Sequence, residues 1–120
     1  MKKIVLGLAF SFISLFAFEH LTMETIDKKI AKGNYIVDFY ATWCPPCKIV
    51  AKNLVEFDKQ KSKKVTIYKV DIDAQMDLAR KYNITRLPTL VYIKDGKVMM
   101  DEVGVKSVDD LAYNSKRLFD

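Results

Sequence analysis

The segment that most restricts the fold is Y-I-V-D-F-Y-A at residues 35–41, which is apolar and rich in strand-forming residues at nearly every position. A strand of this kind is buried on both of its faces, as strands are in mainly parallel sheets that helices cover on each side. The only two cysteines of the chain, Cys44 and Cys47, follow it almost directly. The strand therefore predicts a sheet with the cysteine pair at the carboxyl end of one strand, where open α/β sheets place their chemistry.

Strands and helices are expected to alternate along the rest of the chain. The spacing of Val50, Leu54 and Phe57 predicts a helix from Cys44 to about Lys61. Further strands are expected at residues 18–22, 64–71, 89–94 and 97–103, with shorter helices between 22 and 33, over 73–82 and from 107 onward. Together these elements predict an α/β fold with a central mixed β-sheet flanked by helices on both faces.

Short polar side chains predict where several of these elements begin or turn. Thr22, Asp73 and Ser107 are expected helix N-caps, and Asp110 is placed to complete a capping box with Ser107. The dipeptide Asp95-Gly96 predicts a two-residue hairpin turn between the last two strands.

Residues 1–17 predict a secretory signal peptide rather than part of the fold. A pair of lysines precedes an almost wholly apolar stretch that ends at Phe18 and is short for a membrane span, which needs about 20 residues. Cleavage is expected after Ala17. An uncleaved anchor is the alternative, because Leu15 occupies a position where small residues are usual. The domain proper then covers residues 18–120.

The charge balance gives no indication of nucleic acid as a partner. The formal net charge of the chain is +5, and it falls to +3 without the first segment, because only Lys2 and Lys3 are removed. A mild positive excess favours solubility. Four lysines cluster from Lys59 to Lys64, but no aromatic side chains alternate with them as they do in nucleic-acid grooves. We therefore expect a solvated helix end there and no nucleic-acid partner.

The cysteines and the two prolines between them predict a redox site at a helix start. Cys44 is expected at the N-cap, where the positive end of the helix and the backbone N–H of Cys47 favour its thiolate. Pro45 and Pro46 fit the first turn, whose amides have no helical partner. They also remove two hydrogen-bond donors, and no His or Lys lies between the cysteines. Only a modest lowering of the thiol pKa is expected, which goes with a reducing couple.

Three other uses of the cysteine pair compete with thiol–disulfide exchange. A structural disulfide would close a very small ring, which restrains the unfolded chain little. Zinc needs four ligands, and His20, the only histidine, is remote in the sequence, so copper is the remaining metal alternative. Two reduced core cysteines are not expected at a helix start that follows Trp43. The C-x-x-C spacing therefore favours redox chemistry that needs no metal and no cofactor.

One carboxylate and one proline are further candidates for the site. Asp38 interrupts the apolar strand, and because burial raises the pKa of a carboxyl group we expect it to accept a proton from Cys47, directly or through water. The alternative is a carboxylate at the wet end of the strand. Lys69 on the next strand is its candidate charge partner. A cis bond before Pro88 would turn the Leu87 backbone toward an extended substrate, whereas an ordinary trans proline at a strand start is the alternative.

Together these residues resemble the thioredoxin family, and in particular secreted bacterial thioredoxin-like proteins. The resemblance covers nearly all of residues 18–120. It is carried, in the family's order and spacing, by V-D-F-Y-A-T-W-C-P-P-C-K (37–48), K-V-D-I-D (69–73), Y-N-I-T-R-L-P-T-L (82–90), K-D-G-K (94–97) and V-G-V (103–105). It implies a thioredoxin fold and thiol–disulfide exchange.

The resemblance also implies roles for individual residues. Cys44 would be the nucleophile and Cys47 the resolving thiol. The catalytic set would be completed by the buried carboxylate of Asp38, by Lys69 near it and by Pro88 as a cis-proline facing the cysteines. The substrate groove would be lined by Trp43, Pro45, Leu87, Gly104 and Val105. Three residues depart from the family pattern: Pro45 replaces the usual glycine, Tyr40 stands where Trp is frequent, and Leu87 precedes the proline where Ile is common.

The expected activity is the reduction of disulfides in exported proteins by a monomeric, periplasmic or otherwise extracytoplasmic protein. Thiols drift toward oxidation outside the cytoplasm, so a reductase there needs electrons from inside. The resemblance implies a membrane thiol-transfer protein as the donor. The alternatives are a disulfide oxidase or isomerase, a copper carrier that uses both cysteines without catalysis, and a structural adaptor that uses only the groove.

Overall fold

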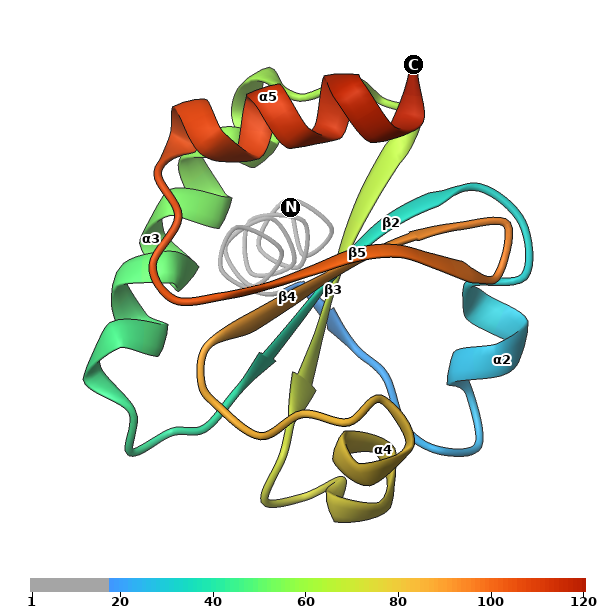
Figure 1. Ribbon diagram of the computed structural model, residues 1–120, viewed down its shortest axis with the longest axis vertical. Coiled ribbons are helices and arrows are strands. Elements are labelled where there is room, and N and C mark those ends of the chain that lie inside the picture. The colour runs from blue at the N-terminus through green and yellow to red at the C-terminus, as the bar shows by residue number, and fades with distance from the viewer. Residues whose placement is uncertain (1–17) are drawn as a thin grey trace, which may run out of the picture.

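The computed structural model describes residues 18–120, and the expected signal peptide at residues 1–17 lies outside them. The described residues form one five-stranded sheet and four helices (Figure 1). The strands are β1 (Glu19–His20), β2 (Asn34–Tyr40), β3 (Val65–Asp71), β4 (Thr89–Lys94) and β5 (Lys97–Val103). The helices are α2 (Ile26–Lys29), α3 (Pro45–Gln60), α4 (Met76–Lys81) and α5 (Val108–Phe119). None of these helices has the length and apolarity that crossing a membrane requires.

The sheet is mixed, and β2 lies at its centre. The strand order is β1-β3-β2-β4-β5. β3 runs parallel to both β1 and β2, whereas β4 runs antiparallel to β2 and β5 runs antiparallel to β4. Because β2 has a neighbour on each side, all of its backbone groups can pair within the sheet. The expected strand near residues 18–22 is present as the short edge strand β1.

Helices cover both faces of the sheet, which explains why β2 is apolar on both sides (Figure 1). Val37 and Phe39 belong to a core that includes Ile26 of α2 and Leu78 of α4. Residues of β2 on the opposite face, such as Ile36, pack in a second core with residues of α3 and α5. The two cores confirm the predicted α/β architecture, in which helices flank a central mixed sheet on both faces.

The predicted capping box and hairpin turn are confirmed. The Ser107 side chain accepts a hydrogen bond from the Asp110 backbone N–H at 3.1 Å, and the Asp110 carboxylate accepts one from the Ser107 N–H at 3.0 Å. Asp95 and Gly96 join β4 to β5 with φ values of 48° and 81°. Both turn residues therefore have the positive φ that a tight hairpin requires.

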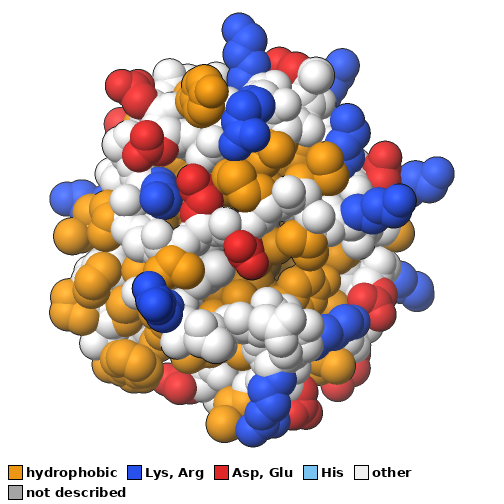
Figure 2. Space-filling model, viewed as in Figure 1, with side chains coloured by type: hydrophobic (Ala, Val, Ile, Leu, Met, Phe, Trp, Pro, Cys, Tyr) orange, Lys and Arg blue, Asp and Glu red, His pale blue; other side chains and the backbone are white. Residues whose placement is uncertain are grey.

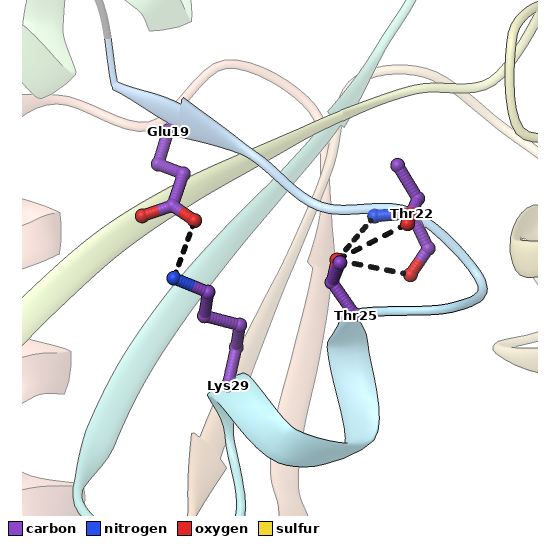
Figure 3. Close-up of polar contacts among 4 residues, drawn as sticks. All are labelled: Glu19, Thr22, Thr25 and Lys29. Carbon is purple, nitrogen blue, oxygen red and sulfur yellow. Dashed lines mark hydrogen bonds and ion pairs between the residues drawn. The ribbon is translucent and has the colours of Figure 1, made fainter.

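The prediction that Thr22 caps the helix α2 is wrong, because a turn precedes that helix (Figure 3). The Thr22 carbonyl accepts hydrogen bonds from the backbone N–H groups of Thr25 and Ile26. The hydroxyl of Thr25 accepts from the Thr22 N–H at 2.9 Å, so the two threonines close this turn on each other. Residue Thr25 is the N-cap of α2. An ion pair of 2.7 Å between Lys29 and Glu19 connects the helix to β1 (Figure 3).

The prediction that Asp73 caps the helix α4 is also wrong. The helix α4 begins three residues later, with Gln75 at its N-cap position. The backbone N–H of Asp73 is held by the carboxylate of Asp71 at 2.9 Å, which keeps it in the turn that follows β3. The Asp73 carboxylate accepts a hydrogen bond from the Trp43 indole and does not cap the helix.

Candidate active site

The sequence places Cys44 between the end of β2 and the first turn of α3. Cys44 has an extended backbone and is the N-cap residue, and Pro45 and Pro46 occupy the first two helical positions. The backbone N–H of Cys47 donates a hydrogen bond to Cys44 Sγ at 3.3 Å. Amides in the first turn of a helix have no partner within the helix, so the missing N–H groups of these two prolines cost no internal hydrogen bond.

Cys44 and Cys47 form a disulfide whose Cα atoms lie 5.3 Å apart. The two residues are 5% and 3% exposed, so only a small part of the pair reaches the surface. The pair packs in a small cluster of its own with Ala41 and, at its margin, Tyr40 and Leu87. The sulfurs are therefore enclosed except where hollows reach them.

A hollow of about 380 Å³ opens on the Cys44 side of the disulfide. Its lining consists of Trp43, Cys44, Pro45, Pro46, Ile72, Ile84, Thr85, Arg86 and Leu87. In the space-filling view, apolar side chains gather in several places on this face, one of them around the start of α3, and charged side chains of both signs lie between and around them (Figure 2). The hollow is thus a largely apolar surface beside a reactive sulfur. Of these lining residues, the sequence predicted Trp43, Pro45 and Leu87. The prediction missed Ile72, Ile84, Thr85 and Arg86. The only signal for these four in the sequence is that they lie within or beside the stretches that resemble the family.

The loop before β4 forms the opposite wall of this hollow. The Leu87-Pro88 peptide bond is cis, as the resemblance implies, and Pro88 is buried. The Thr89 hydroxyl donates to the Arg86 carbonyl at 2.6 Å, and the Gly104 N–H donates to the Pro88 carbonyl at 2.9 Å. These bonds hold the proline loop between β4 and the end of β5.

The two glycine-loop residues of the predicted groove differ in position. Gly104 has a φ of 105°, which L side chains rarely adopt, and its N–H contacts the proline loop. Val105 is 44% exposed and is not part of the hollow's lining. The structure therefore brings Gly104 to the proline loop, and it leaves Val105 exposed and outside the lining of the hollow.

Trp43 is held over the hollow by a contact that sequence reasoning missed. The indole is 66% exposed, and its Nε1–H donates to Asp73 Oδ2 at 2.8 Å. An exposed aromatic ring fixed at one edge offers a flat contact surface at a low cost in conformational entropy. Asp73 was assigned to a helix cap because nothing in the sequence indicates a bond to a residue 30 positions earlier.

Asp38 lies fully buried in β2, so the alternative of a carboxylate at the wet end of the strand is wrong. Lys69 Nζ, on β3, lies 3.5 Å from Asp38 Oδ2. No polar group of residues 18–120 hydrogen-bonds either carboxylate oxygen. Burial raises the pKa of Asp38 to about 6, although the charge of Lys69 acts in the opposite direction. A carboxyl group with this pKa can take up and release a proton near neutral pH.

A second hollow of about 240 Å³ lies on the Cys47 side of the disulfide. Its lining consists of Tyr40, Ala41, Thr42, Cys47, Lys48, Ala51 and Lys69. It therefore joins the second cysteine to the lysine that pairs with Asp38. Of the five residues predicted as catalytic, Cys44 lines the first hollow, and Cys47 and Lys69 line the second. Asp38 pairs with Lys69, and Pro88 directly follows Leu87, which lines the first hollow.

Comparison with known proteins agrees with this geometry. The sequence model of the family described as "Thioredoxin" matches residues 17–117. A thioredoxin of Bacillus subtilis is 37% identical over 90 residues, which cover 75% of this chain and 86% of that protein. A thioredoxin of Staphylococcus aureus is 38% identical over 92 residues, covering 77% and 88% respectively.

The chain belongs to the thioredoxin family. Its mixed five-stranded sheet with flanking helices is the thioredoxin fold, and its C-x-x-C disulfide is that of a thiol–disulfide oxidoreductase. Thioredoxins need no cofactor, since the cysteine pair itself carries the electrons. Among residues 18–120, no three His, Cys, Asp or Glu side chains gather in a way that could hold a metal ion.

Proposed function

We propose that this thioredoxin reduces disulfides of exported proteins, with Cys44 as nucleophile and Cys47 as resolving thiol. The observation that carries the proposal is the arrangement of the disulfide between two unlike hollows. The Cys44 side is apolar and bordered by the exposed Trp43, whereas the Cys47 side leads to the Lys69–Asp38 pair. This arrangement supports substrate contact on the Cys44 side and proton transfer on the Cys47 side.

The first step is attack by Cys44 on a disulfide of the substrate protein. In the reduced form, the Cys47 N–H and the positive end of α3 favour the Cys44 thiolate. The thiolate bonds to one substrate sulfur, and the other substrate sulfur leaves as a thiolate and takes up a proton. A mixed disulfide results, with the substrate chain against Trp43 and the loop that ends at Pro88.

The second step releases the substrate. Asp38, with its pKa raised to about 6, is ionised at neutral pH and takes the proton from the Cys47 thiol, directly or through water in the second hollow. The Cys47 thiolate then attacks Cys44 Sγ, and the substrate leaves as its second thiolate. Two electrons have moved to the substrate, and the protein is left with the disulfide that the structure contains.

The net direction of thiol–disulfide exchange follows from the reduction potential of the cysteine pair, and measuring this potential tests the proposal. Two prolines and no histidine between the cysteines favour a reducing couple. Equilibration of the protein with glutathione buffers is expected to give a potential near about −270 mV, as in thioredoxin. A potential of about −120 to −180 mV would instead assign it to disulfide formation or isomerisation, and the steps above would run in reverse.

Export is supported by the apolar stretch before residue 18. An exported reductase would need a membrane thiol-transfer protein as its electron donor. The test uses a thiol reagent that cannot cross the inner membrane. In cells expressing the full-length chain, with a permeable outer envelope and an intact inner membrane, the reagent should label Cys44. A Cys44→Ser variant is the control for background labelling. Labelling that appears only after lysis would contradict export and leave the redox function as it stands.

A further inference from the structure

Four side chains on three neighbouring strands face the layer of α3. The register places His20 of β1 beside Lys69 of β3, and Lys69 beside Asp38 of β2. Tyr40 lies two residues beyond Asp38 and is therefore on the same face of the sheet. This face carries Ile36, which packs against α3. The sheet thus forms a row that begins at the buried Asp38 and ends at the exposed His20 on the edge strand.

Each member of this row contacts the next. The Tyr40 hydroxyl lies 2.8 Å from His20 Nε2, and the two rings meet edge to face with their centroids 5.8 Å apart. Lys69 Nζ lies 4.5 Å from the centroid of the Tyr40 ring, within the range of a cation–π contact. The same ammonium lies 3.5 Å from Asp38 Oδ2. His20 therefore fixes Tyr40, and the Tyr40 ring lies against the cation that faces Asp38.

Lys69 needs such support because its side chain is long and lies beside open space. It is 15% exposed and, with Tyr40, lines the hollow of about 240 Å³ on the Cys47 side. The ammonium group of such a lysine can move away from the buried carboxylate into water, and only one ion pair is lost when it does. The carboxylate has no such freedom, since neither of its oxygens has a hydrogen-bond partner among residues 18–120.

We propose that His20 and Tyr40 are positioning residues that hold the Lys69 ammonium against Asp38 and thereby set the pH range in which Asp38 can accept the proton of Cys47. The last part rests on the proposed function. Other charged groups near this row are Asp71, which pairs with Tyr40 in the register of β2 and β3, and Lys48, which lines the hollow from α3. Both are kept unchanged in the test.

The direct test is a titration of Asp38 in the oxidised protein, followed by the carbon resonance of its carboxyl group. The lysine charge opposes the effect of burial on the pKa of Asp38, so loosening Lys69 must move the titration midpoint to higher pH. Lys69→Met sets the upper limit, an increase of about 1–3 pH units. Tyr40→Leu removes the ring and is expected to give an increase of about 0.5–1 unit, within that limit.

The contribution of His20 is separated by a double-mutant cycle. Tyr40→Phe keeps the ring and loses only the hydroxyl, and His20→Ala loses its partner. Both are expected to raise the midpoint by the same smaller amount, and the double variant by no more than either single variant. Tyr68→Phe is the matched control. Tyr68 lies next to Lys69 on β3 but faces the other side of the sheet, where it stacks on Tyr35, so the midpoint should not move.

The outcome is decided by the titration and not by turnover. Unchanged midpoints in Tyr40→Leu and Tyr40→Phe, in variants whose thermal unfolding matches that of Tyr68→Phe, would overturn the inference while leaving the proposed function intact. A raised midpoint together with an equal upward move in the pH dependence of Cys47 attack supports the whole proposal. A raised midpoint with an unchanged rate profile would overturn the connection to Cys47, and with it the role given to Asp38.

Discussion

The two sides of the disulfide differ in chemistry although the cysteines are only three residues apart. The hollow beside Cys44 is lined mainly by apolar side chains from three separate segments, and Trp43 at its border is 66% exposed. The hollow beside Cys47 is lined by two lysines and a tyrosine among others, and one of these lysines, Lys69, pairs with the buried Asp38. One side is suited to hold a protein substrate, and the other is suited to move a proton. The difference shows that a C-x-x-C pair is made asymmetric by what the sheet places on each side of it.

The strongest test of this asymmetry exchanges the cysteines one at a time. Cys44→Ser is expected to lower disulfide reduction by at least about a thousandfold, because the nucleophile is lost. Cys47→Ser should accumulate mixed disulfides with substrate proteins, visible on non-reducing gels. The reverse pattern, with trapping by Cys44→Ser, would mean that the two sides have been assigned in the wrong order.

The second test measures how the buried carboxyl group of Asp38 changes the free energy of unfolding with pH. Folding raises the pKa of Asp38 from 3.8 to about 6, so the folded state binds this proton more tightly than the unfolded chain. Stability from this group is therefore greatest below pH 4 and falls as the pH rises to about 6. The free energy of unfolding of Asp38→Asn relative to the parent should increase over that interval, by up to about 3 kcal/mol.

Denaturant unfolding of the oxidised proteins between pH 4 and pH 8 measures this difference. Asp101→Asn, an exposed carboxylate on β5, is the control and should show no comparable change. A constant difference between Asp38→Asn and the parent across the range would show that Asp38 has an ordinary pKa in the folded protein.

A third test concerns turnover. Asp38→Asn retains the shape of the side chain but cannot accept a proton, and general-base assistance is typically worth about a hundredfold or more. The rate of mixed-disulfide resolution is expected to fall by about that factor at pH 7. Its rise with pH through about 6 should also disappear. Stopped-flow measurement with a trapped mixed disulfide separates this step from the attack by Cys44.

The smallest expected effect concerns substrate contact. Trp43→Ala removes an exposed ring that borders the first hollow and is expected to raise KM for a protein disulfide about threefold to tenfold, with a smaller effect on kcat. Tyr113→Ala is the matched control, because Tyr113 is 68% exposed on α5. Equal effects of the two substitutions would mean that the hollow does not hold the substrate.

Local features of the site could be predicted from the sequence because each depends on residues within one turn. The cap at Cys44, the prolines of the first turn and the Ser107–Asp110 capping box are confirmed. The burial of Asp38 was expected because its neighbours on β2 are apolar on both faces. The caps at Thr22 and Asp73 failed because turns of a few residues precede those short helices, and single polar residues do not distinguish a turn from a helix start.

Some contacts between distant segments could be predicted from stretches that resemble the family, whereas other contacts could not. The pairing of Lys69 with Asp38 and the cis bond before Pro88 were expected from motifs that resemble thioredoxins, and the structure contains both. The bonds of Trp43 to Asp73 and of His20 to Tyr40 belong to no such motif and were missed.

The sequence by itself determined that the chain forms a helix-covered sheet and that its two cysteines lie at the end of a buried strand. Alternation, capping and turn chemistry are local, so they can be recognised along the chain. Only the tertiary structure decided which groups surround the cysteines. The strand order brings β1, β3 and β2 side by side, and their register sets His20, Lys69 and Asp38 in one row. Register depends on how whole faces of strands pack against helices, and no short stretch of sequence contains that information.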